Sequence, residues 1–230
     1  MASPDIVAGE APRGLLSVTE RASLESFRFA QRRRKWLLGR WAAKSLLQDL
    51  EMERTGRRPD AASLLILNEP SGLPYAAREA EGRLPLSISI SHRSDWSVAG
   101  VALDPGASLG IDLETIEPRG IEWCADYFVA HEMDAVRAAG KERDRVVATI
   151  WSAKESALKA LGIGLRLDTR RIEVKLTPAH SVPAAAPIDG WMPLDLAAGP
   201  QARLGDAVRA FSMQCPDYVL TAVVLTEQGR

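Results

Sequence analysis

Two acidic side chains, Asp112 and Glu114, lie two residues apart in a run that alternates apolar and polar residues. In a β-strand, residues two apart point to the same face, so both carboxylates would share one face while Ile111 and Leu113 share the other. Carboxylate oxygens are the ligands that hard cations such as Mg²⁺ prefer. The run therefore predicts a strand that presents two metal-ligating groups on one side, although a solvated strand face is the simpler alternative.

A third carboxylate lies on a predicted helix, with a lysine one turn beyond it. Ser152, Glu155 and Lys159 are spaced i, i+3 and i+7, which places them on one helix face. Together with the acidic strand, this face suits a hard cation that binds a phosphate. Taken alone, Glu155 and Lys159 could be an ordinary surface pair that contributes about 0.2–0.5 kcal/mol. The presence of both motifs in one chain favours the metal site.

The two motifs match a known family. Gly110-Ile111-Asp112-Leu113-Glu114 and Trp151-Ser152-Ala153-Lys154-Glu155, followed by Lys159, resemble the paired signature of the 4′-phosphopantetheinyl transferases, in their larger, monomeric, surfactin-type group. Further segments resemble that group in the expected order: the basic, glycine-containing helix at residues 33–40, the loop at 68–75, the serine-histidine motif at 88–92, and residues 128–132. One departure is Leu73, which stands where the family usually has lysine.

The resemblance implies an activity. It is the Mg²⁺-dependent transfer of 4′-phosphopantetheine from coenzyme A to a serine of an apo acyl or peptidyl carrier protein, with release of adenosine 3′,5′-bisphosphate. The expected partners are coenzyme A and the carrier, with no nucleic acid and no membrane, and the chain is expected to be a monomer. A metal-dependent nucleotide pyrophosphate hydrolase would share the acidic residues, and a non-catalytic homologue would only bind coenzyme A.

The resemblance also implies roles for the motif residues. Mg²⁺ would be held by Asp112, Glu114 and Glu155. Glu155 is the first choice for the general base and Glu132 is the reserve, while Lys159 would hold a pyrophosphate oxygen. The expected coenzyme A ligands are Arg34, Lys35, Arg40, Gly72, Pro74, Ser91, His92 and Lys159, with His92 hydrogen-bonded to a phosphate. Because Leu73 replaces a lysine, we expect one of the three cations at positions 34, 35 and 40 to bind the 3′-phosphate.

The composition limits the class of protein. A formal net charge of −1 over 230 residues argues against a general nucleic-acid binder. Positive charge is nonetheless clustered, because residues 28–44 contain no acidic residue. This stretch includes the cations Arg28, Arg32, Arg33, Arg34, Lys35, Arg40 and Lys44. Two cysteines are too few for a disulfide framework, and no apolar run approaches the roughly 20 residues of a membrane span. We therefore expect a cytoplasmic protein, with residues 1–14 as a flexible leader.

The periodicity predicts alternating helices and strands. A helical region with a break should run from the capping-box spacing at Ser17 and Glu20 to about Arg54. We expect further helices at residues 131–139 and 144–161, and strands at residues 64–67, 86–91, 96–103, 109–114, 171–176, 208–214 and 218–225. Residues 178–203 should form a long loop.

A repeat relates the two halves of the chain. Trp41-Ala42-Ala43-Lys44 recurs as Trp151-Ser152-Ala153-Lys154, and the run after Asp95 recurs after Asp217. We expect a pseudo-duplicated α+β fold in which each half packs one main helix on a small antiparallel sheet. The predicted halves are residues 15–115, with coenzyme A binding and the acidic strand, and 116–230, with Glu155, Lys159 and carrier docking. The active site would lie in the cleft between them. The aromatic cluster at 123–128 could be core or a docking surface.

Overall fold

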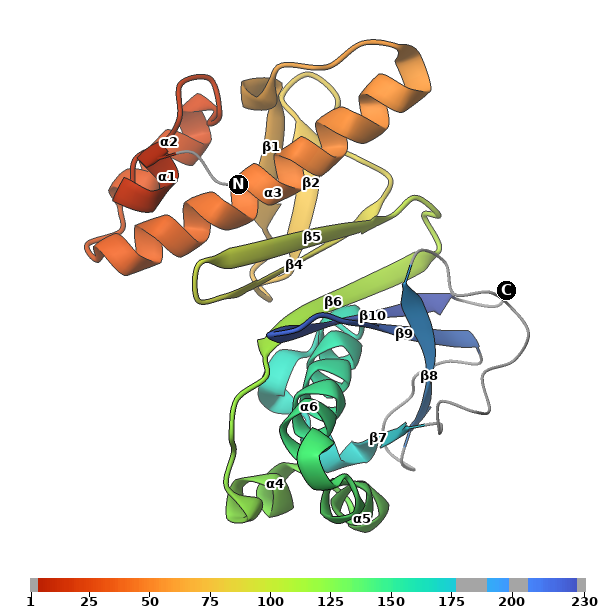
Figure 1. Ribbon diagram of the computed structural model, residues 1–230. Coiled ribbons are helices and arrows are strands. Elements are labelled where there is room, and N and C mark those ends of the chain that lie inside the picture. Colours follow the sequence, from red (N-terminus) through yellow and green to blue (C-terminus); the bar gives the residue numbers. More distant parts are fainter. Residues whose placement is uncertain (1–3, 177–189, 199–206, 227–230) are drawn as a thin grey trace. The chain divides into compact units, whose positions relative to one another are not determined.

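The computed structural model describes residues 4–176, 190–198 and 207–226, and it divides into two compact units, Met1–Pro105 and Gly106–Arg230 (Figure 1). Each unit combines one long helix with antiparallel strands. The predicted α+β plan, with a main helix and a small sheet in each half, is therefore confirmed. Among the described residues, no helix has the length and apolar character needed to cross a membrane.

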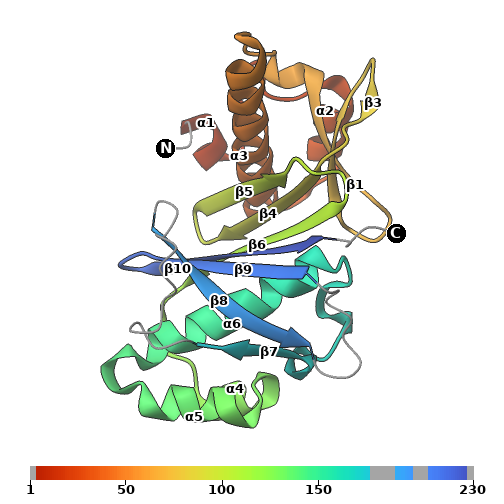
Figure 2. The same ribbon diagram turned by 90° about the vertical axis from the view of Figure 1, so that its right-hand side faces the viewer.

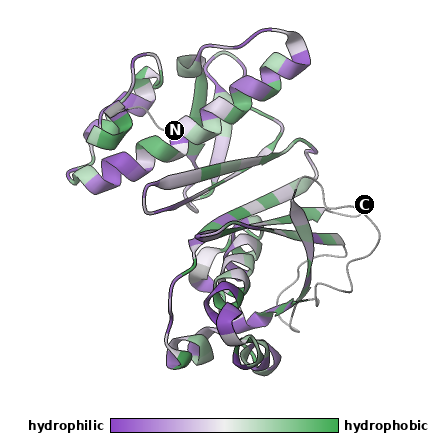
Figure 3. Ribbon diagram, in the orientation of Figure 1, coloured by the Kyte–Doolittle hydropathy of each residue, from purple (hydrophilic) through white to green (hydrophobic). Residues whose placement is uncertain are grey.

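The first unit is built on the long helix α3 (Ala30–Thr55), which contacts strands on one side. These strands are β1 (Leu64–Asn68), β2 (Pro74–Arg78) and β3 (Gly82–Arg83) in one antiparallel sheet, and the hairpin of β4 (Ser87–Arg93) and β5 (Trp96–Ala102). The apolar face of α3 gives Ala43 and Leu47 to a core that also contains Ile66 and Ile88. Hydrophilic and hydrophobic residues alternate along α3, as this half-buried position requires (Figure 3).

The helical region at the N-terminus is broken as predicted. α2 (Val18–Glu25) ends before Phe29, whose extended backbone precedes α3. The capping box is also confirmed, because the Glu20 backbone N–H donates to Ser17 Oγ (3.2 Å) and the Ser17 N–H donates to Glu20 Oε2 (3.1 Å).

The segment expected to be a flexible leader is partly helical, which corrects that prediction. α1 (Pro4–Ala8) buries Ile6 completely against an apolar cluster that includes Leu16, Leu24 and Leu37. Burial of the Ile6 side chain stabilises the packing of α1 in this cluster.

The second unit packs α6 (Arg143–Ala160) on a five-stranded antiparallel sheet, as Figure 2 shows. The strand order is β6 (Ala107–Thr115), β10 (Tyr218–Thr226), β9 (Ala207–Gln214), β8 (Trp191–Ala198) and β7 (Ile172–Lys175). Two short helices, α4 (Ile121–Tyr127) and α5 (Ala130–Ala138), precede α6. Single 3-10 turns lie at Ala61–Ser63, Gly140–Glu142, Gly164–Arg166 and Thr169–Arg171.

The acidic strand belongs to the second unit, which corrects the predicted boundary after residue 115. β6 pairs with β10 over its whole length, with Asp112 opposite Thr221 and Glu114 opposite Val219. The two units meet between Pro105 and Gly106, so the acidic strand and α6 share one unit. The candidate metal ligands therefore lie in one unit, whereas the sequence predicted that they would be divided between the two halves.

Other departures concern short or irregular elements. β2, β3 and α4 were not expected, and β8 lies where residues 178–203 were predicted to form a loop. Residues 178–189 and 199–203 of that predicted loop lie outside the described residues.

The repeat extends into the core as a buried Glu–Lys pair in each unit. Lys44 and Lys154 are the lysines of the two repeated helix motifs, and both are fully buried. Lys44 pairs with Glu20 of α2, and Lys154 pairs with Glu132 of α5 at 2.9 Å. Each glutamate also accepts the N–H of a strand residue, Ile66 or Val174. The two units thus share one internal arrangement, which supports the duplication independently of the helix and strand order.

Candidate active site

A glycine lets α6 approach β6 closely enough to bring the acidic motifs together. A Cβ atom at Gly110 would collide with the carbonyl oxygen of Ser156 and lie 2.6 Å from the Ala160 nitrogen. No other residue can occupy this position without moving the helix. The consequence is that Trp151 and Lys159 contact the acidic strand and that Glu155, between them on α6, lies near its carboxylates.

The first contact between α6 and β6 joins Lys159 to Asp112. The Lys159 ammonium donates to Asp112 Oδ1 at 2.7 Å and to the Ile111 carbonyl at 3.1 Å. Asp112 is buried, whereas 27% of the Lys159 side chain is exposed. An ammonium has three N–H donors, so a third donor remains for a ligand beyond these two acceptors.

The second contact joins Glu114 to two hydrogen-bond donors. Arg119 Nη2 donates to Glu114 Oε2 at 2.7 Å, and the Trp151 indole N–H donates to Glu114 Oε1 at 3.2 Å. Glu114 is buried as well. Its carboxylate is therefore held at both oxygens.

Glu155 lies between these contacts along α6. Burial, followed by the negative charge of Asp112, raises the pKa of the Glu155 carboxyl, and Glu114 adds to the effect while Lys159 opposes it. A carboxyl whose proton affinity is raised by neighbouring carboxylates is a suitable proton acceptor. It is also a group that a cation would stabilise in its charged form.

The donor set at this position fits Mg²⁺, although the described residues contain no group of three His, Cys, Asp or Glu side chains arranged around a metal position. In this structure Asp112 forms an ion pair with Lys159, and Glu114 forms one with Arg119. Three carboxylates, all oxygen donors, are the chemistry that a hard cation requires. Burial and then the charge of Asp112 raise the pKa of Glu155, and a divalent cation would oppose both effects by stabilising the charged carboxylate.

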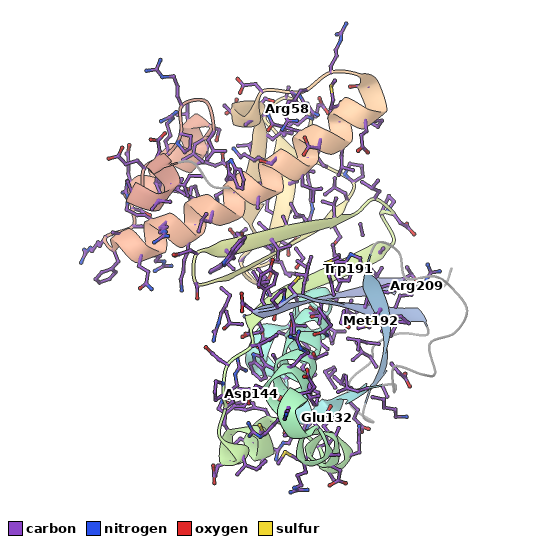
Figure 4. All side chains as sticks on the ribbon, in the orientation of Figure 1. Arg58, Glu132, Asp144, Trp191, Met192 and Arg209 are labelled. Atoms are coloured by element: carbon purple, nitrogen blue, oxygen red, sulfur yellow. The ribbon has the colours of Figure 1, made fainter. Side chains whose placement is uncertain are left out.

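Glu132 does not have the surroundings of a general base, which corrects its role as the reserve. The residue is fully buried between α5 and α6, and Figure 4 labels it there. Oε2 accepts the Val129 N–H at 2.9 Å and pairs with Lys154, while Oε1 accepts the Val174 N–H at 2.7 Å. Each acceptor oxygen is thus occupied inside the core.

A basic cavity of about 510 Å³ lies in the first unit. Five of the predicted coenzyme A ligands line it: Lys35, Arg40, Gly72, Pro74 and His92. Other residues that line it were not predicted: Phe27, Arg32, Trp36, Gly39, Ile66, Asn68 and Ile90. The cavity therefore combines cations, aromatic rings and a histidine, as a nucleotide site requires.

Arg40 forms part of the cavity wall. Its guanidinium lies 3.6 Å from the centre of the Trp36 ring and donates to the Ile66 carbonyl (3.1 Å) and to Asn68 Oδ1 (3.3 Å). Burial lowers the pKa of Arg40 to about 10, against the opposing effect of Glu20. Arg40 is thus fixed in place, and the more exposed cations Arg32 and Lys35 are better placed to receive a phosphate.

Two other predicted ligands do not line this cavity. Arg34 pairs with Asp95 across the β4–β5 turn, with 2.7 Å between Nη2 and Oδ1. Ser91 is buried within β4. Arg34 and Ser91 thus remain predicted coenzyme A ligands outside this cavity, while Lys159 belongs to the acidic site of the second unit.

Residues 108–213 match the family model described as the 4′-phosphopantetheinyl transferase superfamily. The match covers slightly less than half of the chain. The residues that determine the site geometry, from β6 to α6, all lie inside the matched range, and the resemblance read from the sequence is confirmed.

Similar proteins carry the same family name. The chain is 27% identical to a phosphopantetheinyl transferase of a Thraustochytrium species over 189 residues, which covers 76% of this chain and 62% of that protein. It is 29% identical to the 4′-phosphopantetheinyl transferase HetI of a Nostoc species, over 86% of this chain and 81% of HetI. A 4′-phosphopantetheinyl transferase of Bacillus pumilus, psf-1, is 26% identical over 70% of this chain and 64% of its own length.

The chain thus spans less than two thirds of the Thraustochytrium and Bacillus pumilus relatives. Among solved structures, a holo-(acyl-carrier-protein) synthase from Bacillus anthracis in complex with CoA (3′,5′-ADP) is similar with a TM-score of 0.41 and 19% identity. The similarity covers 53% of this chain and 96% of that chain.

The aromatic cluster at residues 123–128 is part of the core next to the acidic site. Trp123 packs edge-to-face on Phe128 and on Trp151, with 5.0 Å between the two tryptophan ring centres. Tyr127 contacts Trp151 as well, at 5.1 Å. Of the two alternatives, the contacts favour core packing that supports Trp151.

Arg119 is the site residue that the phosphopantetheinyl transferase resemblance did not indicate. It lies in neither motif, and its ion pair with Glu114 depends on the path of the chain after β6. The signal available in the sequence was a lone cation shortly after an acidic strand, which occurs too often to be informative.

Proposed function

We propose that this protein transfers the 4′-phosphopantetheine group of coenzyme A to a serine hydroxyl of an apo carrier protein. The serine oxygen forms a bond to the pantetheine-side phosphorus of the pyrophosphate. The bond from that phosphorus to the bridging oxygen breaks, and adenosine 3′,5′-bisphosphate leaves with that oxygen. The serine proton passes to a base.

One observation carries the proposal. The close approach of α6 to β6 at Gly110 brings a lysine and three carboxylates of the two family motifs into one place. Phosphoryl transfer depends on positioning and on charge stabilisation, and these residue types supply both.

Asp112, Glu114 and Glu155 are the proposed Mg²⁺ ligands. When bound there, Mg²⁺ would offset negative charge on the pyrophosphate oxygens. The residues of this chain do the rest: Asp112 and Glu114 are buried and held by hydrogen bonds, so they are oriented before the cation arrives.

Glu155 is the proposed base for the serine proton, since its pKa is raised by burial and by Asp112. Lys159 uses two donors inside the protein and has a third for a phosphate oxygen, so it would stabilise charge on the leaving bisphosphate. The name of the B. anthracis structure mentions CoA (3′,5′-ADP), which is the ligand class that we propose here.

The cavity of the first unit is the proposed site for the adenosine 3′,5′-bisphosphate portion of coenzyme A. Lys35 and Arg32 would bind its phosphates, and His92 would donate to a phosphate oxygen. The relatives' names support a substrate of this kind.

The test is whether bisphosphate release requires the acceptor. Purified protein is incubated with coenzyme A and Mg²⁺, with and without an apo carrier, and the nucleotide products are separated by chromatography. Release only in the presence of the carrier supports the proposal. Release at the same rate without a carrier identifies a hydrolase instead.

A further inference from the structure

We propose that Arg119 is a positioning residue of this site: it holds the Glu114 carboxylate in the orientation in which that carboxylate binds a divalent cation. The inference rests on the proposed function, because it assigns Arg119 a part in the same metal site. Arg119 lies outside both family motifs, and its guanidinium contacts Glu114 and two tryptophan rings.

The contacts of Glu114 carry the inference. Its two oxygens are held separately, Oε2 by Arg119 and Oε1 by the Trp151 indole, at 2.7 Å and 3.2 Å. Two donors on different oxygens fix the rotation of the carboxylate about its last bond. A carboxylate accepts about four hydrogen bonds or metal bonds in all, so these two contacts do not use its whole acceptor capacity.

Aromatic rings fix Arg119 itself. Its guanidinium lies 4.5 Å from the centre of the Trp123 ring and 5.8 Å from that of Trp151. Only 12% of the Arg119 side chain is exposed. A planar guanidinium stacked on a ring has little freedom to rotate, so Trp151 and Arg119 restrain Glu114 as one unit.

The backbone of Arg119 is held as well. Arg143, the first residue of α6, donates from Nη2 to the Arg119 carbonyl at 2.7 Å. At the other end of the connecting segment, the Ile116 N–H donates to the Asp217 carbonyl at 2.9 Å. The guanidinium is therefore placed relative to both α6 and the end of β6.

One nitrogen of this arginine shows that the arrangement is not optimal for stability alone. Arg119 Nη1 is buried and has no hydrogen-bond partner among the residues that the structure describes. A buried, unsatisfied donor is costly, and an apolar residue would avoid the cost. A role in orienting Glu114 explains why an arginine stands here.

The experiment measures binding of Mn²⁺, a spectroscopic substitute for Mg²⁺, to the free protein by electron paramagnetic resonance. The variants are Arg119→Ala, Glu114→Gln and the double variant. We expect Arg119→Ala to weaken Mn²⁺ binding roughly 10–100-fold, as is typical when a residue that orients a metal ligand is lost. In the Glu114→Gln background, Arg119→Ala should have no further effect, because the group it orients no longer ligates.

Three results would overturn the inference. One is Mn²⁺ binding unchanged by Arg119→Ala. Another is tighter binding, which would mean that the arginine only competes with the cation for Glu114. The last is an equal loss of Mn²⁺ affinity when Arg119→Ala is made in the wild type and in Glu114→Gln, which would show that Arg119 acts through general stability.

A second variant covers the case in which Arg119→Ala does not fold by circular dichroism. Arg119→Lys keeps the charge but loses the planar stack on Trp123, and we expect several-fold weaker Mn²⁺ binding. Wild-type affinity in this variant would contradict the inference. Arg145→Ala is the matched control with unchanged metal binding expected, because Arg145 is a half-buried arginine of the same unit that binds the Cys215 carbonyl instead of a carboxylate of the site.

The Mn²⁺-binding assay uses neither coenzyme A nor a carrier. It therefore tests the role of Arg119 independently of the proposed transfer activity. If wild-type protein binds Mn²⁺ but modifies no carrier, the proposed function fails and the mutant cycle still decides the role of Arg119. If wild-type protein modifies a carrier but the cycle shows no coupling between Arg119 and Glu114, only this inference fails.

Discussion

Gly110 of β6 lies directly against the carbonyl of Ser156 on α6, so that even one additional carbon on the glycine would overlap that oxygen. This contact sets the distance between the helix and the acidic strand. This short distance allows Lys159 to donate to Asp112 and the Trp151 indole to donate to Glu114. The glycine of the strand motif is thus a structural requirement of the site.

Gly110→Ala should displace α6 from β6. Overpacking of this kind costs about 1–3 kcal/mol of unfolding free energy. We expect activity to fall by about 10²-fold, since a shift of about 1 Å in a catalytic group has that effect. Denaturant unfolding and turnover would be measured together. Ser108→Ala, at an exposed position two residues earlier on the same strand, is the control and should stay near wild type. Wild-type turnover in Gly110→Ala would mean that the helix is not held by this contact.

Glu155→Gln should have opposite effects on turnover and on stability. Because Glu155 is the proposed base, its replacement should lower turnover by about 10²–10⁴-fold. The affinity for coenzyme A should stay the same. The pKa of Glu155 is raised in the folded protein, chiefly by burial and then by Asp112. The folded state therefore binds more protons than the unfolded state, and stability is lost as pH rises from the ordinary carboxyl pKa through the raised one.

It follows that, in EDTA, Glu155→Gln should be more stable than wild type at pH 7, and that the difference should vanish below the ordinary pKa of 4.5. Thermal unfolding at several pH values measures this. A variant less stable than wild type at neutral pH would show that the Glu155 carboxylate is not strained by its neighbours.

The buried pair of Glu132 and Lys154 should be structural. Glu132→Ala leaves Lys154 buried and unpaired, so we expect a loss of about 3–5 kcal/mol. Replacing both residues by apolar ones, as in Glu132→Leu with Lys154→Met, should recover much of this stability. The double variant should also keep measurable transfer activity. If it folds but its turnover falls by orders of magnitude, Glu132 is a catalytic base after all.

Recognition of the 3′-phosphate should depend on cations of the first-unit cavity. Lys35→Ala and Arg32→Ala should each reduce the preference for coenzyme A over 3′-dephospho-coenzyme A, since a charge-assisted contact contributes about 1.5–3 kcal/mol. Calorimetry with both ligands measures the preference. Arg34→Ala is the matched control, because Arg34 pairs with Asp95 and does not line the cavity. If only Arg34→Ala narrows the preference, the cavity is not the 3′-phosphate site.

The elements with strong periodicity could be predicted from the sequence. β6 alternates cleanly and α6 repeats every three or four residues, and both lie within a few residues of their predicted bounds. Weakly patterned elements could not be predicted. α4 has seven residues and no side-chain cap, β2 begins at a proline, and β8 contains Pro193 within its strand.

The unit boundary and the partners of the site residues were harder to predict, because they depend on contacts between residues that are far apart in the sequence. The assignment of β6 to the second unit follows from its pairing with β10. The resemblance implied Glu132 as the reserve base, and its contacts with Lys154 and Val174 could not be predicted from periodicity because these residues lie far from it in the sequence. The residue types of the acidic site could be predicted, while Arg119, which holds Glu114, could not.

The most direct test of the proposed function is the mass of an apo carrier protein after incubation with this protein, coenzyme A and Mg²⁺. Intact-protein mass spectrometry should show one phosphopantetheine group added to the carrier, and none added when the acceptor serine of the carrier is replaced by alanine. The Glu155→Gln variant should give little product in the same time. A panel of apo carriers of both the acyl and peptidyl types that all remain unmodified by the folded wild-type protein would contradict the account.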